Sequence, residues 1–229
     1  MSDALEGVYN AFLTNTIPKI WAKVCYPSLK SLGSWTRDLE LRIDFIDTWL
    51  KYGLPQSFWL SGFFFPQGFM TGVLQTHARK YDLPIDQLKV DFEVRPTTLA
   101  QEEIYTQHKE AGKEVLECYK GLRQPEDGVL VHGLFLDAAK FDTSKMVLSD
   151  PNPGEVNPPL PAMALVPVTD RPSMEGRYEC PLYKTSVRAG VLSTTGHSTN
   201  FVITVLLPSD HPQSYWILKG TALLTQVTD

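Results

Sequence analysis

Apolar residues in the first quarter of the chain recur at intervals of three and four, which is the spacing of an amphipathic helix. The pattern is clearest over residues 39–50, where the apolar stripe consists of Leu39, Ile43, Ile46 and Leu50, with Phe45 and Trp49 beside it. Ser34 is expected to cap this helix, and Asp38 in the early turns is favoured by the helix dipole. Gly53 and Pro55 provide the stop signal.

A second helix is predicted over Pro66–Tyr81, because proline is preorganised for the first helical position. Gly68 and Gly72 each cost about 1 kcal/mol relative to alanine inside a helix, so small residues there indicate a close neighbour. Two shorter helices are expected upstream, in ALEGVYNAFL and KIWAKV. Together these segments predict a small helical bundle in the N-terminal half of the chain.

The periodicity changes to two over residues 88–95, where apolar and charged side chains alternate as in a half-buried strand. Residues 97–127 are polar and charged, and we interpret them as a solvent-facing connector. Beyond them, short segments rich in β-branched and aromatic residues predict the strands of a barrel or a sandwich. These segments are GVLVHGLFL, AMALVPV, YECPLYKT, NFVITVLLP and YWILKGTALLTQV.

The predicted fold class is therefore α+β, with helices first and strands afterwards. Residues 1–96 are expected to form a helical subdomain with a first strand near 88–95, followed by the polar connector and a β subdomain over residues 128–229. Residues 151–167 are rich in proline, which forbids a regular helix and predicts a long loop across the β subdomain.

The chain has 229 residues, of which 43% are hydrophobic, so it can bury one large core or two modest ones. Its 21 Lys and Arg residues against 26 Asp and Glu residues provide no general attraction to nucleic acid or anionic lipid. We expect neither a nucleic-acid partner nor a membrane partner. The N-terminal MSDALEGVYN does not resemble a signal peptide, which favours a cytoplasmic protein. Three cysteines without metal-ligand spacing, Cys25, Cys118 and Cys180, are expected to be reduced thiols.

The sequence contains no phosphate-binding loop, dinucleotide fingerprint, H-E-x-x-H motif or C-x-x-C pair. The nearest catalytic match is GHSTN, in which Asn200 replaces the second glycine of a nucleophile elbow, so Ser198 is a poor candidate nucleophile. The histidines lack the helical spacing that would direct two imidazoles at one metal; they are His77, His108, His132, His197 and His211. We predict no catalytic, cofactor-binding or metal-binding residues and no cofactor.

The stretch FWLSGFFFPQGFM is unusually aromatic but too short to cross a membrane, which takes about 18 consecutive apolar residues. It belongs in a protein interior or an interface. One interpretation is that the aromatic side chains anchor the core where the helices meet the first strands. The other is that part of the run is exposed as a docking surface. The residues concerned are Phe58, Trp59, Phe63, Phe64 and Phe65.

This run belongs to a longer ordered pattern that covers most of the chain. The pattern comprises WLKYGLPQSFWLSGFFFPQGFMTGVLQTHARKYDLPID, DGVLVHGLFLDAAKFD, CPLYKTSVRAGVLSTTGHSTNFVITVLLPSD and YWILKGTALLTQV. It closely resembles the C-terminal domain of dynein heavy chains. FWLSGFFFPQ and LSTTGHSTNFV resemble the forms found in the axonemal branch of that family. Residues 97–124 depart from the resemblance, because they form a longer connection than the family has there.

The resemblance implies a helical part that follows the last AAA module of the motor ring, and then an incomplete antiparallel β-barrel. It implies that the domain is not itself an enzyme, lies across one face of the ATPase ring and modulates movement along microtubules. The expected partners are the AAA ring modules of the same heavy chain, with microtubules reached only through the parent motor. The expected location is the cytoskeleton, in the axoneme of a cilium or flagellum.

Two other hypotheses stay open on the sequence alone. One is a free-standing β-barrel module that binds a peptide or a small ligand, which would need a concave pocket with convergent polar groups. The other is a hydrolase that uses Ser198 as its nucleophile.

Overall fold

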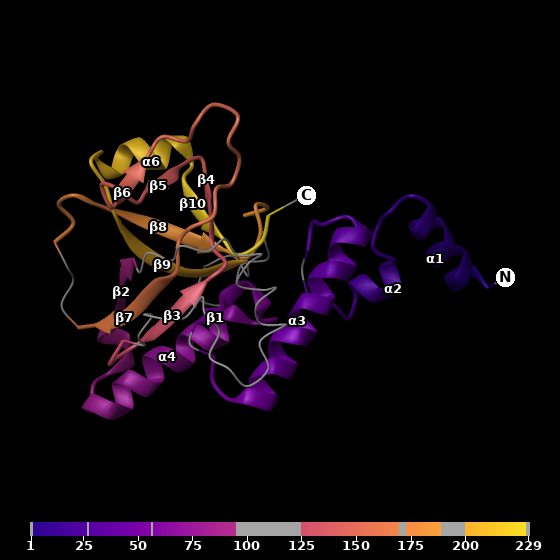
Figure 1. The fold of residues 1–229 in the computed structure, drawn as a ribbon, viewed down its shortest axis with the longest axis horizontal. Coiled ribbons are helices and arrows are strands. Elements are labelled where there is room, and N and C mark those ends of the chain that lie inside the picture. Colours follow the sequence, from indigo (N-terminus) through magenta and orange to yellow (C-terminus); the bar gives the residue numbers. More distant parts are fainter. Residues whose placement is uncertain are drawn as a thin grey trace.

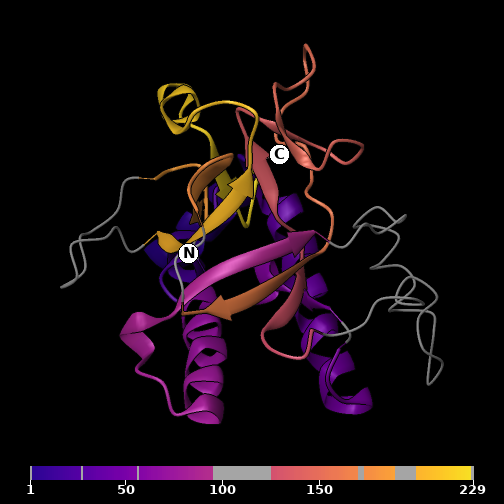
Figure 2. The ribbon, with the colours of Figure 1, turned by 90° about the vertical axis from the view of Figure 1, so that its left-hand side faces the viewer.

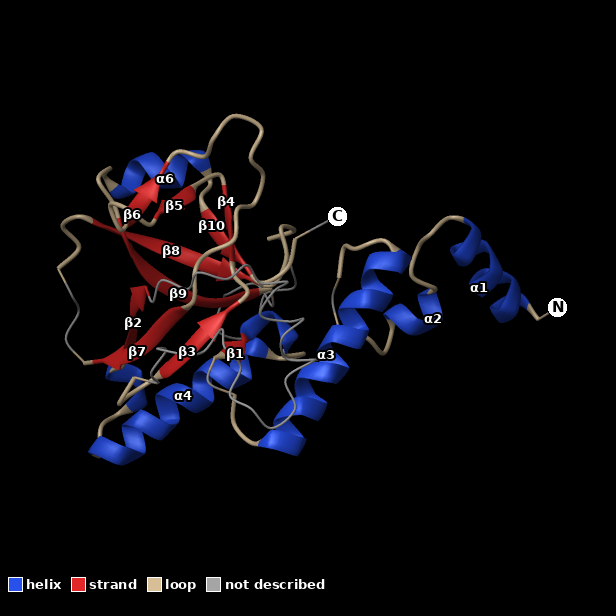
Figure 3. Cartoon of the chain, in the orientation of Figure 1, coloured by secondary structure: helices blue, strands red, loops and turns tan. Residues whose placement is uncertain are grey.

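The structure is a computed structural model that describes residues 2–26, 28–55, 57–94, 125–169, 173–188 and 200–227. Helices and strands occupy different parts of the molecule (Figure 1, Figure 3). The strands gather at one end, whereas the N-terminal helices extend away from them. The order of helices first and strands afterwards agrees with the predicted α+β class.

The first four described α-helices lie where helices were predicted, whereas the last one lies in a segment predicted as a strand. They are α1 (Asp3–Leu13), α2 (Lys19–Ala22), α3 (Leu32–Tyr52), α4 (Pro66–Tyr81) and α6 (Gln213–Lys219), with the 3-10 helices η1 (Leu60–Gly62) and η2 (Ile85–Gln87). The prediction for α4 is confirmed at both ends. Helix α3 begins earlier than predicted, because Ser31 rather than Ser34 occupies the N-cap position. None of the described helices is long and apolar enough to cross a membrane.

The buried face of α3 is not the predicted apolar stripe. The buried side chains follow one another at spacings of three and four, and they are Trp35, Asp38, Arg42 and Phe45. The exposed members of the predicted stripe are Ile43, Ile46 and Leu50. At 3.6 residues per turn the centres of the two sets are about 90° apart around the helix axis, so they lie on two adjacent faces of α3. The helix is amphipathic as expected, but it packs through a face that carries two charged residues.

The strands of the described residues are β1 (Phe58–Trp59), β2 (Lys89–Val94), β3 (Val129–His132), β4 (Phe135–Asp137), β5 (Lys140–Asp142), β6 (Val147–Ser149), β7 (Met163–Val168), β8 (Arg177–Tyr183), β9 (Phe201–Pro208) and β10 (Ala222–Leu224). Strand β2 confirms the strand predicted over residues 88–95. The predicted single strand GVLVHGLFL is instead divided at Gly133, which has φ 82°. Its two halves, β3 and β4, belong to different sheets.

The described strands form two four-stranded sheets and one two-stranded hairpin. Their strand orders are β1-β3-β7-β2, β4-β10-β8-β9 and β5-β6. The β1–β3 and β10–β8 pairs are parallel and the other pairs are antiparallel. Figure 2 shows the edge strands β2 and β9 side by side between the two larger sheets. No sheet of the described residues closes into a barrel, so the antiparallel barrel predicted for residues 128–229 is not confirmed.

The segment YWILKGTALLTQV, predicted as a strand, begins as helix α6. Pro212 precedes this helix, and Gly220, with φ 70°, ends it. The buried indole of Trp216 donates a hydrogen bond to Ser209 Oγ at 2.6 Å, which holds α6 against the sheet. The strand prediction is wrong for the first half of the segment, because a proline before it and a glycine after it favour a helix. The second half forms β10.

The proline-rich segment follows its prediction only in part. Residues 151–162 contain no regular helix and cross to β4, where Leu136 N donates to the carbonyl of Pro158 at 3.0 Å. Pro167, at the end of the predicted loop, lies instead in β7 and pairs with Val90 of β2. The loop therefore ends at Ala162, immediately before β7.

One hydrophobic core joins the helical and the β parts. Its members include Phe45, Trp59, Met70 and Val90 from the N-terminal part, and Val131, Leu136, Leu165, Cys180, Leu207 and Trp216 from the C-terminal part. Helix α1 has no buried residue, so a separate helical bundle is not confirmed. The boundaries of the predicted subdomains, 1–96 and 128–229, stay a prediction. The predicted connector lies outside the described residues as far as residue 124.

Candidate docking surface

The aromatic run passes from the core to the surface. Phe58 and Trp59 in β1 are buried, whereas Phe64 and Phe65 are 49% and 65% exposed. Phe63 lies between these two groups and stacks on a phenylalanine ring of α4, with 4.3 Å between the ring centroids. The buried end of the run can anchor the core, and the exposed end is free to contact a partner.

Two glycines allow the aromatic run to pack closely. A Cβ atom on Gly62 would overlap the indole ring of Trp59, and one on Gly68 would overlap the ring of Phe65. The close neighbour predicted for Gly68 is therefore present. At Gly72, by contrast, none of the described residues lies within 4 Å of the position that a Cβ would take.

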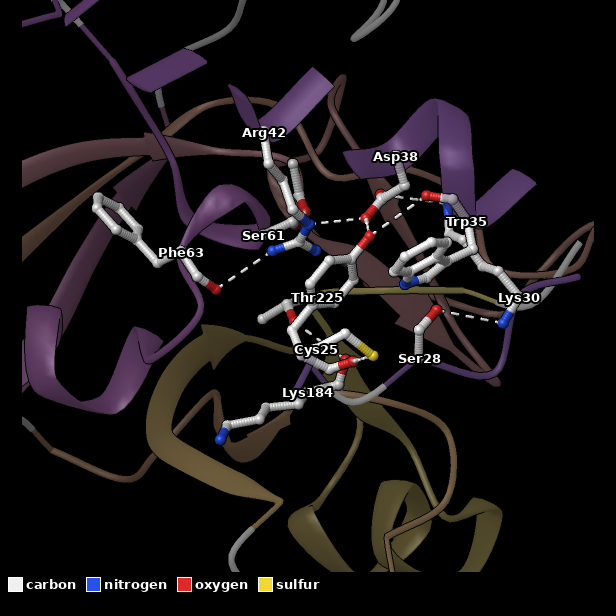
Figure 4. A network of polar contacts seen from close by, with 12 residues as sticks. Cys25, Ser28, Lys30, Trp35, Asp38, Arg42, Ser61, Phe63, Lys184 and Thr225 are labelled. Atoms are coloured by element: carbon white, nitrogen blue, oxygen red, sulfur yellow. Dashed lines mark hydrogen bonds and ion pairs between the residues drawn. The ribbon is translucent and has the colours of Figure 1, made fainter. Parts of the chain in front are cut away.

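A fully buried guanidinium lies beneath the exposed end of the run. Arg42 is 0% exposed, and its Nε donates to Asp38 Oδ2 at 2.7 Å (Figure 4). The hydroxyl of Tyr26 donates to the same carboxylate oxygen at 2.6 Å. The ammonium of Lys30 lies 3.4 Å from the other carboxylate oxygen. Arg42 Nη1 also donates to the carbonyl of Phe63 at 3.4 Å, which links α3 to the aromatic run.

Aromatic rings enclose the same guanidinium. Arg42 Cζ lies 3.8 Å from the ring centroid of Tyr26, 5.6 Å from that of Trp59 and 5.9 Å from that of Phe64. Cation–π contacts are strongest where the cation is desolvated, as it is here. Arg42 Nη2 is buried and has no hydrogen-bond partner among the described residues. The charge of Arg42 is therefore held by one carboxylate and by the faces of the rings.

The network shifts the pKa values of its two acidic groups in opposite directions. Burial, the largest influence on Asp38, acts to raise its pKa, but the Arg42 charge and the hydrogen bonds from Tyr26 and Arg42 together lower it. Burial and the hydrogen bond to Asp38 raise the pKa of Tyr26. At neutral pH the pair therefore consists of an ionised Asp38 and a protonated Tyr26.

A second exposed apolar surface lies on the N-terminal helices. The exposed large apolar side chains of α1, α2, α3 and the loop between α2 and α3 are Leu5, Tyr9, Phe12, Leu13, Ile20, Val24, Leu29, Ile43, Ile46 and Leu50, and we call this set the open helical face. Helices α1 and α2 contain no buried residue, and Figure 1 shows both extending away from the sheets. Asn15 ties α1 to α3, because its carbonyl accepts from Leu32 N at 2.9 Å and its side chain accepts from Gly33 N at 3.1 Å. Clustered exposed apolar residues usually mark an interaction surface.

The described histidines do not converge on one site. His77 Nδ1 lies 3.8 Å from a carboxylate oxygen of Asp127, and His132 Nδ1 lies 2.8 Å from the hydroxyl of Ser57. His211 stacks on a tyrosine ring of α6. Within the described ranges, no group of three or more His, Cys, Asp or Glu residues could hold a metal ion. The candidates that lie outside those ranges are His108, Cys118, His197 and Ser198.

A groove of about 320 Å³ lies between α4, β2 and β9. Its walls include the apolar side chains of Leu74, Val90 and Ile203, and its charged members are Lys89 and Glu179. Few polar groups converge in it, whereas a specific ligand site normally has several that fix the orientation of the ligand. The groove is therefore a poorer candidate for a binding site than the two exposed apolar surfaces.

Known proteins match this chain along almost its whole length. The family model for the C-terminal domain of the dynein heavy chain matches residues 1–225. Dynein axonemal heavy chain 6 of Homo sapiens is 54% identical over 100% of the chain, and dynein axonemal heavy chain 1 of Mus musculus is 43% identical over 98% of it. Dynein axonemal heavy chain 12 of Homo sapiens is 44% identical over 100% of it. The chain spans 6%, 5% and 7% of the lengths of these three relatives, respectively.

Proposed function

Because this protein belongs to the family of C-terminal domains of dynein heavy chains, we propose that it packs on the AAA ATPase ring of its own heavy chain. Its role there is structural and regulatory: the domain carries out no catalysis and modulates the microtubule-based activity of the motor. The matched relatives are axonemal heavy chains, which supports a motor that works in the axoneme of a cilium or flagellum. Microtubules are reached only through the parent motor.

The open helical face is the observation that carries this proposal. Helix α3 presents one face to the core of the domain and a second apolar stripe to solvent, in which Leu50 is 81% exposed. A stripe with helical periodicity is what a second protein surface needs in order to pack along the helix. Helices α1 and α2 continue the same kind of surface. A large neighbouring module of the same polypeptide would cover it.

We expect the isolated domain neither to bind Mg-ATP tightly nor to hydrolyse it. The sequence has no phosphate-binding loop, and among the described residues no group of three or more His, Cys, Asp or Glu could hold a metal ion. Isothermal titration calorimetry with Mg-ATP should therefore record only heats of dilution. A stoichiometric binding event with micromolar affinity would contradict the non-catalytic role.

Regulation requires more than contact with the ring. A domain that touches several modules changes the population of a ring conformation only if its contacts differ between conformations. Coupling free energies of this kind are typically about 1 to 3 kcal/mol, which corresponds to roughly 5- to 150-fold changes in an equilibrium. A substitution on the docking surface should therefore alter motility and leave the nucleotide sites of the ring intact.

We expect Leu50→Lys in the full-length heavy chain to change the velocity of microtubule gliding several-fold. The substitution places a charge in the expected contact at the C-terminal end of α3, whereas the exposed position makes it harmless to the fold of the domain itself. Gliding velocity and the microtubule-stimulated ATPase rate should be measured on the same preparation, with the ring confirmed intact by electron microscopy.

Arg37→Glu is the control, because Arg37 is also exposed on α3 but lies about 140° around the helix axis from Leu50, on another side of the helix. This variant should move microtubules at the wild-type velocity. If the two variants behave alike, the open helical face is not the docking surface. If neither Leu50→Lys nor other charged substitutions across that face alter motility, the regulatory role itself is wrong.

A further inference from the structure

The exposed end of the aromatic run lies beside a lysine from the β part. The Nζ atom of Lys184, which follows β8, lies 5.6 Å from the ring centroid of Phe65. The main chain of Lys184 is fixed, because Thr225 Oγ1 donates to its carbonyl at 3.0 Å and Thr225 N donates to the carbonyl of Tyr183 at 2.9 Å. The cation and the ring therefore come from distant parts of the sequence but form one surface.

Lys184 is half-buried, and its charge is not neutralised within the described part of the chain. No carboxylate of the described residues forms an ion pair with its ammonium, and in Figure 4 no dashed line reaches its nitrogen. Loss of hydration on burial lowers the pKa of the lysine. Buried charges are normally paired, so a partly desolvated ammonium of this kind favours contact with an anion.

The ring of Phe65, which lies beside this cation, and the ring of the preceding residue, Phe64, are positioned by their neighbours. The ring of Phe65 rests on the backbone of Gly68, where there is no room for a Cβ atom. The ring of Phe64 contacts the ring of Tyr26 edge-on at 5.5 Å between centroids and lies 5.9 Å from the guanidinium carbon of Arg42. Both rings nevertheless keep about half or more of their surface exposed, at 49% for Phe64 and 65% for Phe65. A partner would thus meet aromatic surfaces that are already oriented, which limits the entropy lost on binding.

We propose that Phe64, Phe65 and Lys184, the junction patch, dock an aspartate or glutamate side chain that projects from an apolar surface of the motor ring in the same heavy chain. This inference rests on the proposed function, in which the ring is the partner. The cation selects a carboxylate by charge complementarity. The exposed phenyl rings of the patch select a carboxylate with apolar neighbours, because covering these rings removes apolar surface from water. The junction patch joins the helical part to the β part, so its occupant contacts both.

A carbodiimide reagent tests this contact directly in the purified full-length heavy chain. The reagent activates a carboxylate, which then forms an amide with a lysine that is already within ion-pair distance. We expect mass spectrometry to find Lys184 joined to an Asp or Glu peptide from outside residues 1–229. Lys219 supplies the internal control, because it forms an ion pair with Asp150 and should yield that cross-link in every sample. Lys145, which is exposed on the β5–β6 turn, gives the background level of cross-linking for an exposed lysine.

Two variants make the result specific. Lys184→Arg keeps the charge but removes the amine, so the cross-link should be lost while the Lys219–Asp150 cross-link is kept. Phe65→Ala should reduce the yield of the Lys184 cross-link, whereas Leu218→Ala, a change at an exposed position of α6, should not. An amine-acylating reagent should modify Lys184 in the intact motor more slowly than Lys145, because the docked partner would cover Lys184.

The failures of the two proposals can be told apart. If other residues of this domain are cross-linked to the ring but Lys184 is not, the junction patch is wrong and the proposed function stands. A Lys184 cross-link within residues 1–229, or to a different protein, also overturns the patch. If no residue of the domain is joined to the ring although the Lys219–Asp150 cross-link forms, the proposed function is wrong as well.

Discussion

Replacement of Asp38 by alanine is expected to lower the free energy of unfolding of the domain by about 3 to 5 kcal/mol. The reason is that Asp38 is the counter-ion of Arg42, whose side chain is completely buried. Without the carboxylate, the guanidinium would be left in the protein interior with aromatic rings and one carbonyl as its neighbours. Urea unfolding of the purified domain, followed by tryptophan fluorescence, measures this change.

The matched control is Asp47→Ala. Asp47 and Lys51 form an ion pair with the same spacing of four residues on the same helix, but their side chains are 51% and 60% exposed. Exposed pairs of this kind contribute about 0.2 to 1 kcal/mol, so the control should lose little stability. Equal losses for the two variants would show that burial does not make the Asp38–Arg42 pair important.

The same pair should make stability depend on pH. The pKa of Asp38 is lowered in the folded protein, so its ionised form contributes stability above the unfolded-state pKa of about 3.9. That contribution is lost as the pH falls through the lower folded-state value. The difference in stability between the wild type and Asp38→Ala should therefore be constant near neutral pH and shrink in acid.

The elements that could be predicted from the sequence are those with strong local signals. Helix α4 has proline in its first turn and is predicted over the full observed range, and β2 has strict alternation of apolar and charged residues. Helix α6 also has such signals, in Pro212 and Gly220, but its aromatic and β-branched residues favour a strand by propensity. Local signals at the ends of a segment outweigh the propensity of its middle.

The buried face of α3 could not be predicted, because it depends on contacts between distant parts of the sequence. A stripe of Ile and Leu indicates one face, yet α3 packs through Asp38 and Arg42. Their charges are tolerated inside only because Tyr26 and the aromatic run surround them. No pattern within α3 predicts this arrangement, since a charged pair at a spacing of four also occurs on the exposed side of the helix.

Only part of the candidate docking surface could be predicted, because the rest also depends on contacts between distant parts of the sequence. The aromatic run indicates both a core anchor and a docking surface, and the exposure of Phe64 and Phe65 is consistent with each role being filled by a different end of the run. Lys184 was missed, because nothing in its neighbourhood in the sequence distinguishes it from any other lysine. Its position beside Phe65 follows from the packing of β8 against the helical part.

Gly128→Ala is expected to be as damaging as the loss of Asp38, although it adds a single methyl group. A Cβ at this position would overlap the carbonyl oxygen of Leu165 and lie 2.9 Å from Val166 Cα, both in β7. These are backbone atoms in the middle of a sheet, so they cannot rotate away as a side chain would. Gly128 immediately precedes β3, and β3 pairs with β7 from Val129 onward. The new methyl group would therefore push apart the two strands at the point where their pairing begins.

Two destabilising effects add in Gly128→Ala, and the same substitution at a second glycine measures one of them alone. Overpacking costs about 1 to 3 kcal/mol, and a left-handed backbone conformation costs a residue with a side chain about 1 to 2 kcal/mol more. Gly154 has a similar φ of 80° against 91° at Gly128, but none of the described residues lies within 4 Å of the Cβ position there. In urea unfolding, Gly154→Ala should therefore be destabilised only by the conformational cost. Gly128→Ala should be destabilised by both costs. If the two variants are equally stable, β7 is not held against Gly128 as described, and the close approach of β3 to β7 at this point is wrong.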